Sequence, residues 1–235
     1  MLSKFSNTQI NNLGDRLRHG ERTVSDVKML DMFRRSFGST YDQTMHFLSD
    51  ELHLEPTGRP AKSTNSIIEK LEREKSRLVT IQDIAGCRIV LTDCIEQDKL
   101  VKSLSEHFAN NNIIDRRVKP SFGYRAVHFV AYVDGKPIEI QIRTTLQHLW
   151  AELSERLSDV YRPIKYGGGP PKIRSILDSL SLRISKYENL ETRLLSFANQ
   201  IVEVKEDVLA SVKEDMAALK LDIEQELKDF IKVLE

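Results

Sequence analysis

Two carboxylates, Asp83 and Glu139, have the sequence surroundings expected of reactive residues. Asp83 comes directly before an apolar segment in "IQDIAGCRIVL", and Glu139 lies in "KPIEIQIRT". Carboxylates on neighbouring strands supply two hard oxygen ligands, and nucleotide phosphates complete the coordination that Mg²⁺ prefers. The same residues also fit structural roles, with Asp83 as a helix cap and Glu139 paired with Arg143 or Arg88.

A basic loop leads into a predicted helix in "GRPAKSTNSIIEKLER". Helical spacing places Lys70 and Arg73 on one face with Ser66 and approximately with Lys62. Cations at a helix N-terminus suit phosphate, because their charge adds to the free backbone N–H groups and to the helix dipole. A solvated helix face gives the same pattern, since charged side chains are seldom buried without a partner.

A third candidate segment, "RRVKPSFGYRAVH", surrounds a glycine-containing loop. An aromatic ring beside cations can stack on a base while the cations hold phosphates. The residues concerned are Arg116, Arg117, Lys119, Tyr124, Arg125 and His128. The alternative is structural, with Tyr124 as a half-buried strand aromatic and His128 as a satisfied histidine on a polar strand face.

Residues 136–144 alternate between apolar and polar side chains, which is typical of a strand. Three isoleucines occupy one face, and Glu139, Gln141 and Arg143 occupy the other. This polar face is either the solvent side of an edge strand or the floor of a charged site. In the helix that follows, His148 and Glu152 have a metal-ligand spacing, but without a third ligand they fit a helix-surface pair better.

The remaining pattern predicts helices before and after a small sheet. Residues 1–50 are predicted to be helical, residues 56–62 form a loop, and helix returns at residue 64 with Thr64 or Asn65 as its N-cap. The predicted strands are 87–92, 113–119, 126–133 and 136–144, with a helix at 96–110 and a hairpin turn at Asp134-Gly135. The breaker "YGGGPP" precedes a stretch without Gly or Pro, which is typical of two helices or one broken helix.

This order predicts an α+β fold in three parts. They are an N-terminal helical segment (1–50), a mixed domain (51–168) and a C-terminal helical extension (169–235). The 35 Lys and Arg residues balance the 35 Asp and Glu residues, so the net charge does not indicate a protein that binds nucleic acid over its whole surface. No apolar run approaches the ~18 residues of a membrane span, and no secretory leader is evident, so we expect a cytoplasmic protein without a membrane partner. Cys87 and Cys94 fit neither a disulfide scaffold nor a zinc site.

Four motifs occur in order with sensible gaps: "RPAK" with "SI" and "K" after it, then "DIAGCRIVL", then "GYRAVH", then "EIQIRT" with "WAE". Together, over residues 55–165, they resemble the synthetase domain of the RelA/SpoT family. The resemblance implies a nucleotidyltransferase-like mixed β-sheet flanked by helices. It also implies a pyrophosphokinase that transfers pyrophosphate from ATP to the 3′-hydroxyl of GDP or GTP, makes (p)ppGpp and releases AMP, with Mg²⁺ as cofactor.

The resemblance further implies roles for individual residues. Asp83 and Glu139 would be catalytic and hold Mg²⁺, and Glu139 would alternatively help to deprotonate the attacking hydroxyl. The implied ATP-binding residues are Arg59, Lys62, Ser66, Lys70, Arg73 and Arg88, with Arg59 and Arg88 on either side of adenine. The implied acceptor-binding residues are Lys119, Tyr124, His128, Gln141, Arg143 and His148, with Tyr124 stacked on the base.

Departures from the family pattern leave the acceptor open. Ala126 stands where the family usually has serine, and His148 stands where small synthetases often have asparagine. One alternative is therefore a toxin, paired with an antitoxin protein, that pyrophosphorylates the 3′-CCA end of tRNA. The cations that would guide tRNA are Lys4, Arg16, Arg18, Arg22, Lys28, Arg34 and Arg35. A second alternative is a catalytically silent nucleotide sensor, which the presence of Asp83 and Glu139 argues against.

The chain shows no "HD" motif of a hydrolase domain, so it resembles a stand-alone small synthetase. The apolar stripe of the C-terminal helices needs a partner surface. We therefore expect these helices to pack on the domain and to form a homo-oligomer, or else to bind an antitoxin.

Overall fold

The computed structural model describes residues 5–198 and 206–234. Within them the chain divides into two compact units, each built from several segments of the sequence. Unit 1 comprises the described residues of Met1–Ile89, Ser105–Ile113 and His128–Gln141, and unit 2 those of Val90–Leu104, Ile114–Val127 and Ile142–Glu235. None of the helices in the described parts of the chain is long and apolar enough to cross a membrane.

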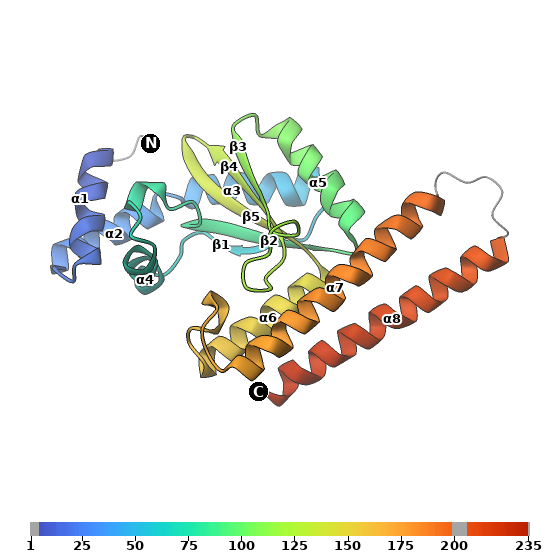
Figure 1. The fold of residues 1–235 in the computed structure, drawn as a ribbon. Helices are drawn as coiled ribbons and strands as arrows, with labels where there is room; N and C mark the ends of the chain where they lie inside the picture. The colour runs from blue at the N-terminus through green and yellow to red at the C-terminus, as the bar shows by residue number, and fades with distance from the viewer. Residues whose placement is uncertain (1–4, 199–205, 235) are drawn as a thin grey trace. The chain divides into compact units, whose positions relative to one another are not determined.

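Five strands form one mixed sheet in the order β1-β2-β5-β4-β3 (Figure 1). They are β1 (Thr57–Arg59), β2 (Ala85–Leu91), β3 (Asn111–Asp115), β4 (Val127–Val133) and β5 (Lys136–Thr144). With the helices described below, this sheet confirms the predicted α+β class. The predicted hairpin is also present, because Asp134 (φ 51°) and Gly135 (φ 74°) form the two-residue turn between β4 and β5.

Two strand predictions need correction. Residues 56–62 are not entirely loop, because β1 pairs antiparallel with β2. All three residues of β1 are exposed, so the sequence has no alternation of apolar and polar residues there that would predict a strand. The strand predicted at 113–119 is β3, which begins at Asn111 and already ends at Asp115. The carboxylate of Asp115 accepts the backbone N–H of Arg117 at 2.8 Å, which turns the chain at that point.

Unit 1 contains the N-terminal helices α1 (Asn7–Arg18), α2 (Val24–Arg35) and α3 (Gly38–His46), a π-helical turn (Phe47–Glu51) and α4 (Thr64–Glu74). Capping boxes start α1 at Ser6 and α2 at Thr23. Each hydroxyl accepts the backbone N–H three residues on, and the side chain at that position accepts the backbone N–H of the cap residue. Helix α1 packs against α2 and α4. The N-cap of α4 is Ser63, one residue before the predicted Thr64.

Unit 2 contains most of α5 (Cys94–His107) and all of α6 (Thr145–Val160), α7 (Pro171–Ala198) and α8 (Glu206–Val233). The C-terminal stretch thus contains two described helices, and the predicted break between them falls at residues 199–205, outside the described residues. Helices α6, α7 and α8 lie side by side (Figure 1). Buried Ile223, Leu227 and Ile231 of α8 join one apolar core with α6 and α7. The predicted homo-oligomer and antitoxin stay predictions.

Candidate functional site

Asp83 forms the centre of a charged cluster in unit 1. Its carboxylate binds the ammonium groups of Lys62 at 2.7 Å and Lys70 at 2.8 Å. Lys62 comes just before the N-cap of α4, Lys70 lies two turns into that helix, and Asp83 precedes β2. Burial raises the pKa of Asp83, but the two lysines outweigh it and lower the pKa to about 2. Asp83 is therefore ionised and is not the helix cap of the structural alternative.

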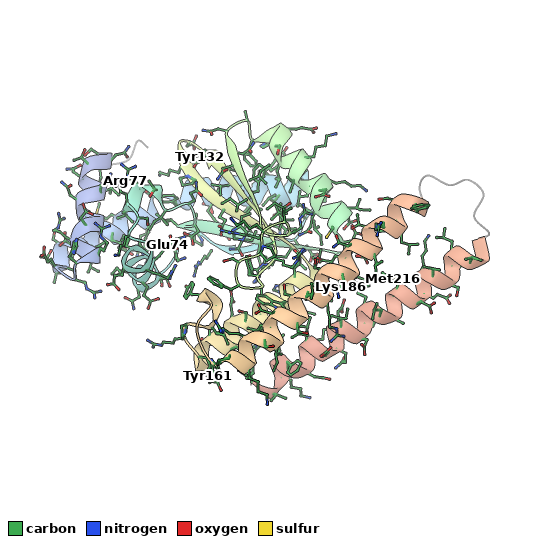
Figure 2. The ribbon with its side chains drawn as sticks, viewed as in Figure 1. Glu74, Arg77, Tyr132, Tyr161, Lys186 and Met216 are labelled. Atoms are coloured by element: carbon green, nitrogen blue, oxygen red, sulfur yellow. The ribbon has the colours of Figure 1, made fainter. Side chains whose placement is uncertain are left out.

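Neighbouring residues fix this cluster in place. The backbone N–H of Lys62 donates to the carbonyl of Ile84 at 2.6 Å, and Arg34 of α2 donates to the carbonyl of Lys62 at 3.3 Å. Beside Asp83 in the chain, Gln82 donates to the hydroxyl of Tyr132 at 3.1 Å. Figure 2 labels Tyr132, which belongs to β4. The contribution of Arg34 was missed from the sequence, because no local spacing connects α2 with the loop before α4.

The first turn of α4 presents hydroxyls and backbone donors. The side chain of Ser63 accepts the N–H of Ser66 at 3.2 Å and donates to its hydroxyl at 2.8 Å. This arrangement suits an anion, as predicted for a helix N-terminus. Arg73, predicted to share this function, is an exposed residue that pairs with Glu74 at 2.9 Å.

Arg59 and Arg88 lie on the same face of the β1–β2 pair. In the antiparallel register Arg59 is opposite Gly86, and Arg88 is opposite Thr57. Opposite residues and alternate residues share a face, so the two arginines are diagonal neighbours with only a glycine opposite Arg59. The Nε of Arg88 is buried and has no hydrogen-bond partner within the described residues. This geometry is suitable for two guanidinium planes around one base.

Glu139 on β5 is bound by two side chains of unit 1. Nδ1 of His128 lies 2.9 Å from its Oε1, and Gln141 donates to its Oε2 at 2.7 Å. Burial raises the pKa of Glu139, but the bonds and charge of His128 and the Gln141 amide outweigh it, so the pKa is lowered overall. The alternative pairing of Glu139 with Arg143 or Arg88 is therefore wrong, and His128 has a charged partner that the sequence did not predict.

Unit 2 contains a second cluster, Tyr124 with Arg143. The Arg143 guanidinium lies 5.2 Å from the centre of the Tyr124 ring and donates to its hydroxyl at 3.1 Å. Tyr124 closes a turn in which it exchanges backbone hydrogen bonds with Ser121, so it is not a strand residue. Arg143 is 3% exposed, although its place in the alternating strand predicted an open polar face. Lys119 is exposed after β3, and His148 lies on α6.

The carboxylates fit a metal only with help from a ligand. No group of three or more His, Cys, Asp or Glu in the described parts of the chain is arranged to hold a metal ion. Asp83 and Glu139 are nevertheless near enough for the charge of Asp83 to raise the pKa of Glu139. Two carboxylates completed by phosphate oxygens are a usual donor set for Mg²⁺. In the other candidate metal pair, His148 and Glu152, the carboxylate of Glu152 binds the guanidinium of Arg156 at 3.1 Å.

Several predicted cations are already neutralised by carboxylates. Arg16 pairs with Asp26 at 2.7 Å, Arg18 pairs with Asp15 at 2.7 Å, and both Arg34 and Arg35 pair with Asp31. Lys4 is outside the described residues. In unit 2, Arg117 binds Asp98 and Asp115, each at 2.7 Å. These cations therefore offer less free positive charge to phosphate than their number in the sequence suggests.

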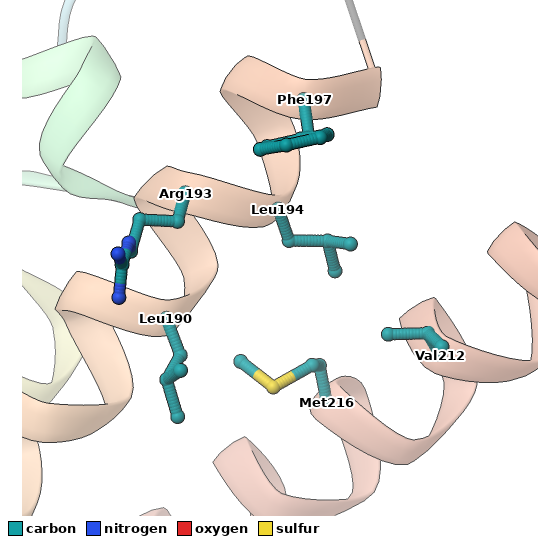
Figure 3. A pocket seen from close by; sticks show the side chains of 6 residues that line it. All are labelled: Leu190, Arg193, Leu194, Phe197, Val212 and Met216. Carbon is teal, nitrogen blue, oxygen red and sulfur yellow. The ribbon is translucent and has the colours of Figure 1, made fainter. Parts of the chain in front are cut away.

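A separate pocket between α7 and α8 has a different chemistry (Figure 3). Its lining is apolar apart from one arginine, and consists of Leu190, Arg193, Leu194, Phe197, Val212 and Met216. The thioether of Met216 points towards the leucines of α7 (Figure 3). Such a surface does not suit a triphosphate, so we do not place the nucleotide there.

The chain is similar in sequence to two bacterial proteins and in fold to a solved alarmone synthetase. An uncharacterized protein of Mycobacterium tuberculosis is 42% identical over 118 residues, which cover 48% of this chain and 43% of that protein. The match thus spans less than half the length of the mycobacterial relative. A GTP pyrophosphokinase of Bacillus subtilis is 29% identical over 153 residues, covering 59% of this chain and 66% of that enzyme. The crystal structure of small alarmone synthetase 1 from Bacillus subtilis aligns with a TM-score of 0.53 and 23% identity, covering 72% of this chain and 95% of that chain.

The fold defines a class: an α+β domain with the fold of the small alarmone synthetases. The family follows from the sequence. Residues 58–163 match the family model described as "Region found in RelA / SpoT proteins". This region of the chain is therefore a RelA/SpoT family domain.

Proposed function

We propose that the chain is a pyrophosphokinase that transfers pyrophosphate from ATP to the 3′-hydroxyl of GDP or GTP. The observation that carries the proposal is Asp83, held between Lys62 and Lys70 and close to the ionised Glu139. Phosphoryl-type transfer needs little covalent work from a protein, chiefly in-line positioning and cations around the developing negative charge. The reaction of the related GTP pyrophosphokinase supports the same class.

In this reaction the 3′-oxygen of the acceptor forms a bond to the β-phosphorus of ATP. The bond from that phosphorus to the oxygen bridging to the α-phosphate breaks, and AMP leaves. The hydroxyl proton passes to Glu139, whose lowered pKa keeps it ionised, or through His128, which Glu139 orients. Lys62 and Lys70 would exchange Asp83 for the transferred phosphates, with Ser66 at the helix N-terminus beside them.

We assign Mg²⁺ to Asp83 and Glu139, with ATP phosphates as the remaining ligands. The ion would neutralise phosphate charge and polarise the group being transferred. In the absence of phosphate, Lys62 and Lys70 balance the charge of Asp83, and His128 and Gln141 hold Glu139. The protein thus keeps both carboxylates ionised and ready to bind the ion.

The bases are assigned to the two arginine-containing surfaces. Arg59 and Arg88 would enclose adenine, and Tyr124 would stack on the acceptor base while Arg143 holds its ring in place. Lys119, His128, Gln141 and His148 remain proposed contacts of the acceptor or its phosphates, and Arg73 a proposed contact of ATP. Strand β5 contributes Glu139 and Gln141 to unit 1 and Arg143 to unit 2.

A tRNA acceptor has weaker support. Affinity for a nucleic-acid backbone depends on cations that are free to displace counterions. Four of the N-terminal arginines instead pair with Asp15, Asp26 and Asp31. A catalytically silent nucleotide sensor would not need two carboxylates, Asp83 and Glu139, that are both held in the ionised form. Catalysis is therefore the better proposal.

The test is transfer of label from ATP labelled at its β-phosphate, with Mg²⁺ and with GDP, GTP or deacylated tRNA in separate reactions. We expect labelled product from GDP or GTP, AMP in equal amount, and no transfer by Asp83→Ala or Glu139→Gln. The exposed Asp42→Asn is the matched control and should keep full activity. Label in tRNA alone would replace the proposal with the toxin, and a fully active Asp83→Ala would remove the metal assignment.

A further inference from the structure

Helix α7 follows the family region and presents one buried face to the rest of unit 2. One row of this face consists of Leu177, Ser181, Ile184 and Glu188, at intervals of four, three and four residues, with buried Leu180 and Tyr187 beside it. Such intervals place side chains in one row along a helix. Two members of the row are polar, which is unusual for a face that serves only as apolar packing.

Glu188 binds the start of α6 with its carboxylate. Its Oε1 accepts the Thr144 hydroxyl at 2.6 Å, and both its oxygens accept the Gln147 amide, at 3.0 and 3.1 Å. Thr144 is the N-cap of α6 and directly follows Arg143. Gln147 completes the capping box, because its Oε1 accepts the N–H of Thr144 at 3.2 Å. The bonds to Glu188 therefore fix the backbone on which Arg143 is carried.

Ser181 binds the chain next to Tyr124, the other member of the pair. Its hydroxyl donates to the carbonyl of Gly123 at 2.6 Å, and Gly123 directly precedes Tyr124. Further along the same face, the indole of Trp150 donates to the carbonyl of Leu177 at 2.9 Å. Helix α7 is thus attached on one side to the turn that carries Tyr124 and on another to the strand end that carries Arg143.

The burial of a polar side chain at Glu188 calls for an explanation beyond packing. The residue is 4% exposed, and burying a carboxylate is costly unless hydrogen bonds and charges compensate. Burial raises the pKa of Glu188 overall, although the hydrogen bonds from Thr144 and Gln147 and the charge of Arg125 act in the opposite direction. Replacing Glu188 alone by an apolar residue would take this acceptor away from the Thr144 hydroxyl and the Gln147 amide. The carboxylate instead gives these two donors a defined geometry.

We propose that Glu188 and Ser181 of α7 are positioning residues that hold Arg143 and Tyr124 in the arrangement needed to bind the acceptor base. Each acts through a chain neighbour: Glu188 binds Thr144, which follows Arg143, and Ser181 binds Gly123, which precedes Tyr124. The inference rests on the proposed function for its kinetic readout, because Tyr124 and Arg143 are assigned to the acceptor there. It also makes α7 a necessary part of the acceptor site, although α7 lies outside residues 58–163.

The kinetic test separates acceptor from donor. In Glu188→Ala, the KM for GDP or GTP should rise ~10–100-fold, as expected for a small misplacement of binding groups. The KM for ATP should change less than about twofold, because the donor residues belong to unit 1. Ser181→Ala should raise the same KM less, since one neutral hydrogen bond is lost. Glu188→Gln retains one acceptor oxygen and should recover most of the affinity.

Tyr187→Phe is the matched control. Tyr187 is buried next to Glu188 on α7, and its hydroxyl donates to Glu191 at 2.7 Å, away from the start of α6. This variant should lose stability without changing either KM. The inference is overturned if Glu188→Ala raises both KM values equally, or if Tyr187→Phe reproduces its effect on the acceptor.

A second readout does not depend on activity. Glu188→Ala should accelerate hydrogen exchange at the amides of Thr144 and Gln147, whose mutual capping bonds Glu188 stabilises, by at least ~10-fold. The amides of α8 should exchange as in the parent protein. If the parent protein transfers nothing to GDP or GTP, the proposed function fails, and this exchange pattern alone decides the positioning role. Unchanged exchange at Thr144 and Gln147 would refute it.

Discussion

At the scale of single residues, the site is organised by the partners of its carboxylates. Asp83 is bound by two ammonium groups, and Glu139 is bound by an imidazole and an amide. Charged residues in the sequence showed that such pairs were possible, but not which cation would meet which carboxylate. The choice matters, because each pairing sets how the carboxylate responds to pH.

The pH dependence of stability should reveal the ion pairs of Asp83. Its folded-state pKa is about 2, below the ordinary value of 3.8, so its stabilisation is complete above pH 3.8 and is lost as the pH falls towards 2. The shift corresponds to about 2 kcal/mol. We expect Asp83→Asn to be less stable than the parent protein at pH 7, with a difference that shrinks between pH 4 and pH 2. Urea unfolding measured across this range checks it, and a difference independent of pH would contradict it.

At the scale of elements, caps and turns determine where functional side chains point. The N-cap of helix α4 is one residue earlier than the predicted Thr64, because the side chain of Ser63 accepts the N–H of Ser66. The turn before β4 uses Phe122 and Gly123 with positive φ angles of 52° and 86° to present Tyr124. Both features are local in the chain, and each one sets the position of a proposed site residue: Ser66 after the cap and Tyr124 after the turn.

The corrected cap gives a prediction about α4. Ser63→Ala removes the capping hydroxyl and should destabilise the protein by ~1 kcal/mol. Thr64→Ala is the control and should change stability by less than about 0.5 kcal/mol. Thermal or urea unfolding at pH 7 measures both. Equal effects of the two substitutions would return the cap to the position predicted from the sequence.

The turn at Gly123 gives a second prediction about an element. An alanine there would adopt a left-handed backbone, and its Cβ would lie 2.8 Å from Cζ2 of Trp150. Strain and overlap together should cost at least ~2 kcal/mol. Gly20→Ala has the same kind of backbone (φ +76°) with nothing within 4 Å, so it isolates the strain and should cost less. Unfolding followed by the fluorescence of Trp150 compares the two; an equal loss would mean that the turn moves away from the indole.

At the scale of the whole molecule, the C-terminal helices are part of a folded unit. Ile223, Leu227 and Ile231 of α8 are buried in the core that α6 and α7 provide. An apolar stripe predicted that these helices would need a partner, and α6 supplies one. Apolar residues on α7 and α8 remain exposed at the pocket of Figure 3, so the predicted oligomer is still open to test.

Leu227→Asp tests how far the fold depends on α8. Leu227 is fully buried, and an unpartnered carboxylate there should destabilise unit 2 by more than ~4 kcal/mol. Leu221→Asp, on the exposed side of the same helix, should change stability by less than about 0.5 kcal/mol. Circular dichroism and urea unfolding distinguish them. A well-folded Leu227→Asp would show that α8 is dispensable to the core.

The sequence by itself determined the elements and the candidate residues. Alternating isoleucines predicted β5, Asp134-Gly135 predicted its hairpin, and four ordered motifs predicted the family that residues 58–163 match. These features depend on neighbours within a few positions, so the sequence contains them directly. Only the tertiary structure decided that Lys62 and Lys70 share Asp83, that His128 meets Glu139, and that Glu188 supports the start of α6. Such pairings join residues 11 to 44 positions apart, and which partners meet depends on how strands and helices pack around each buried charge.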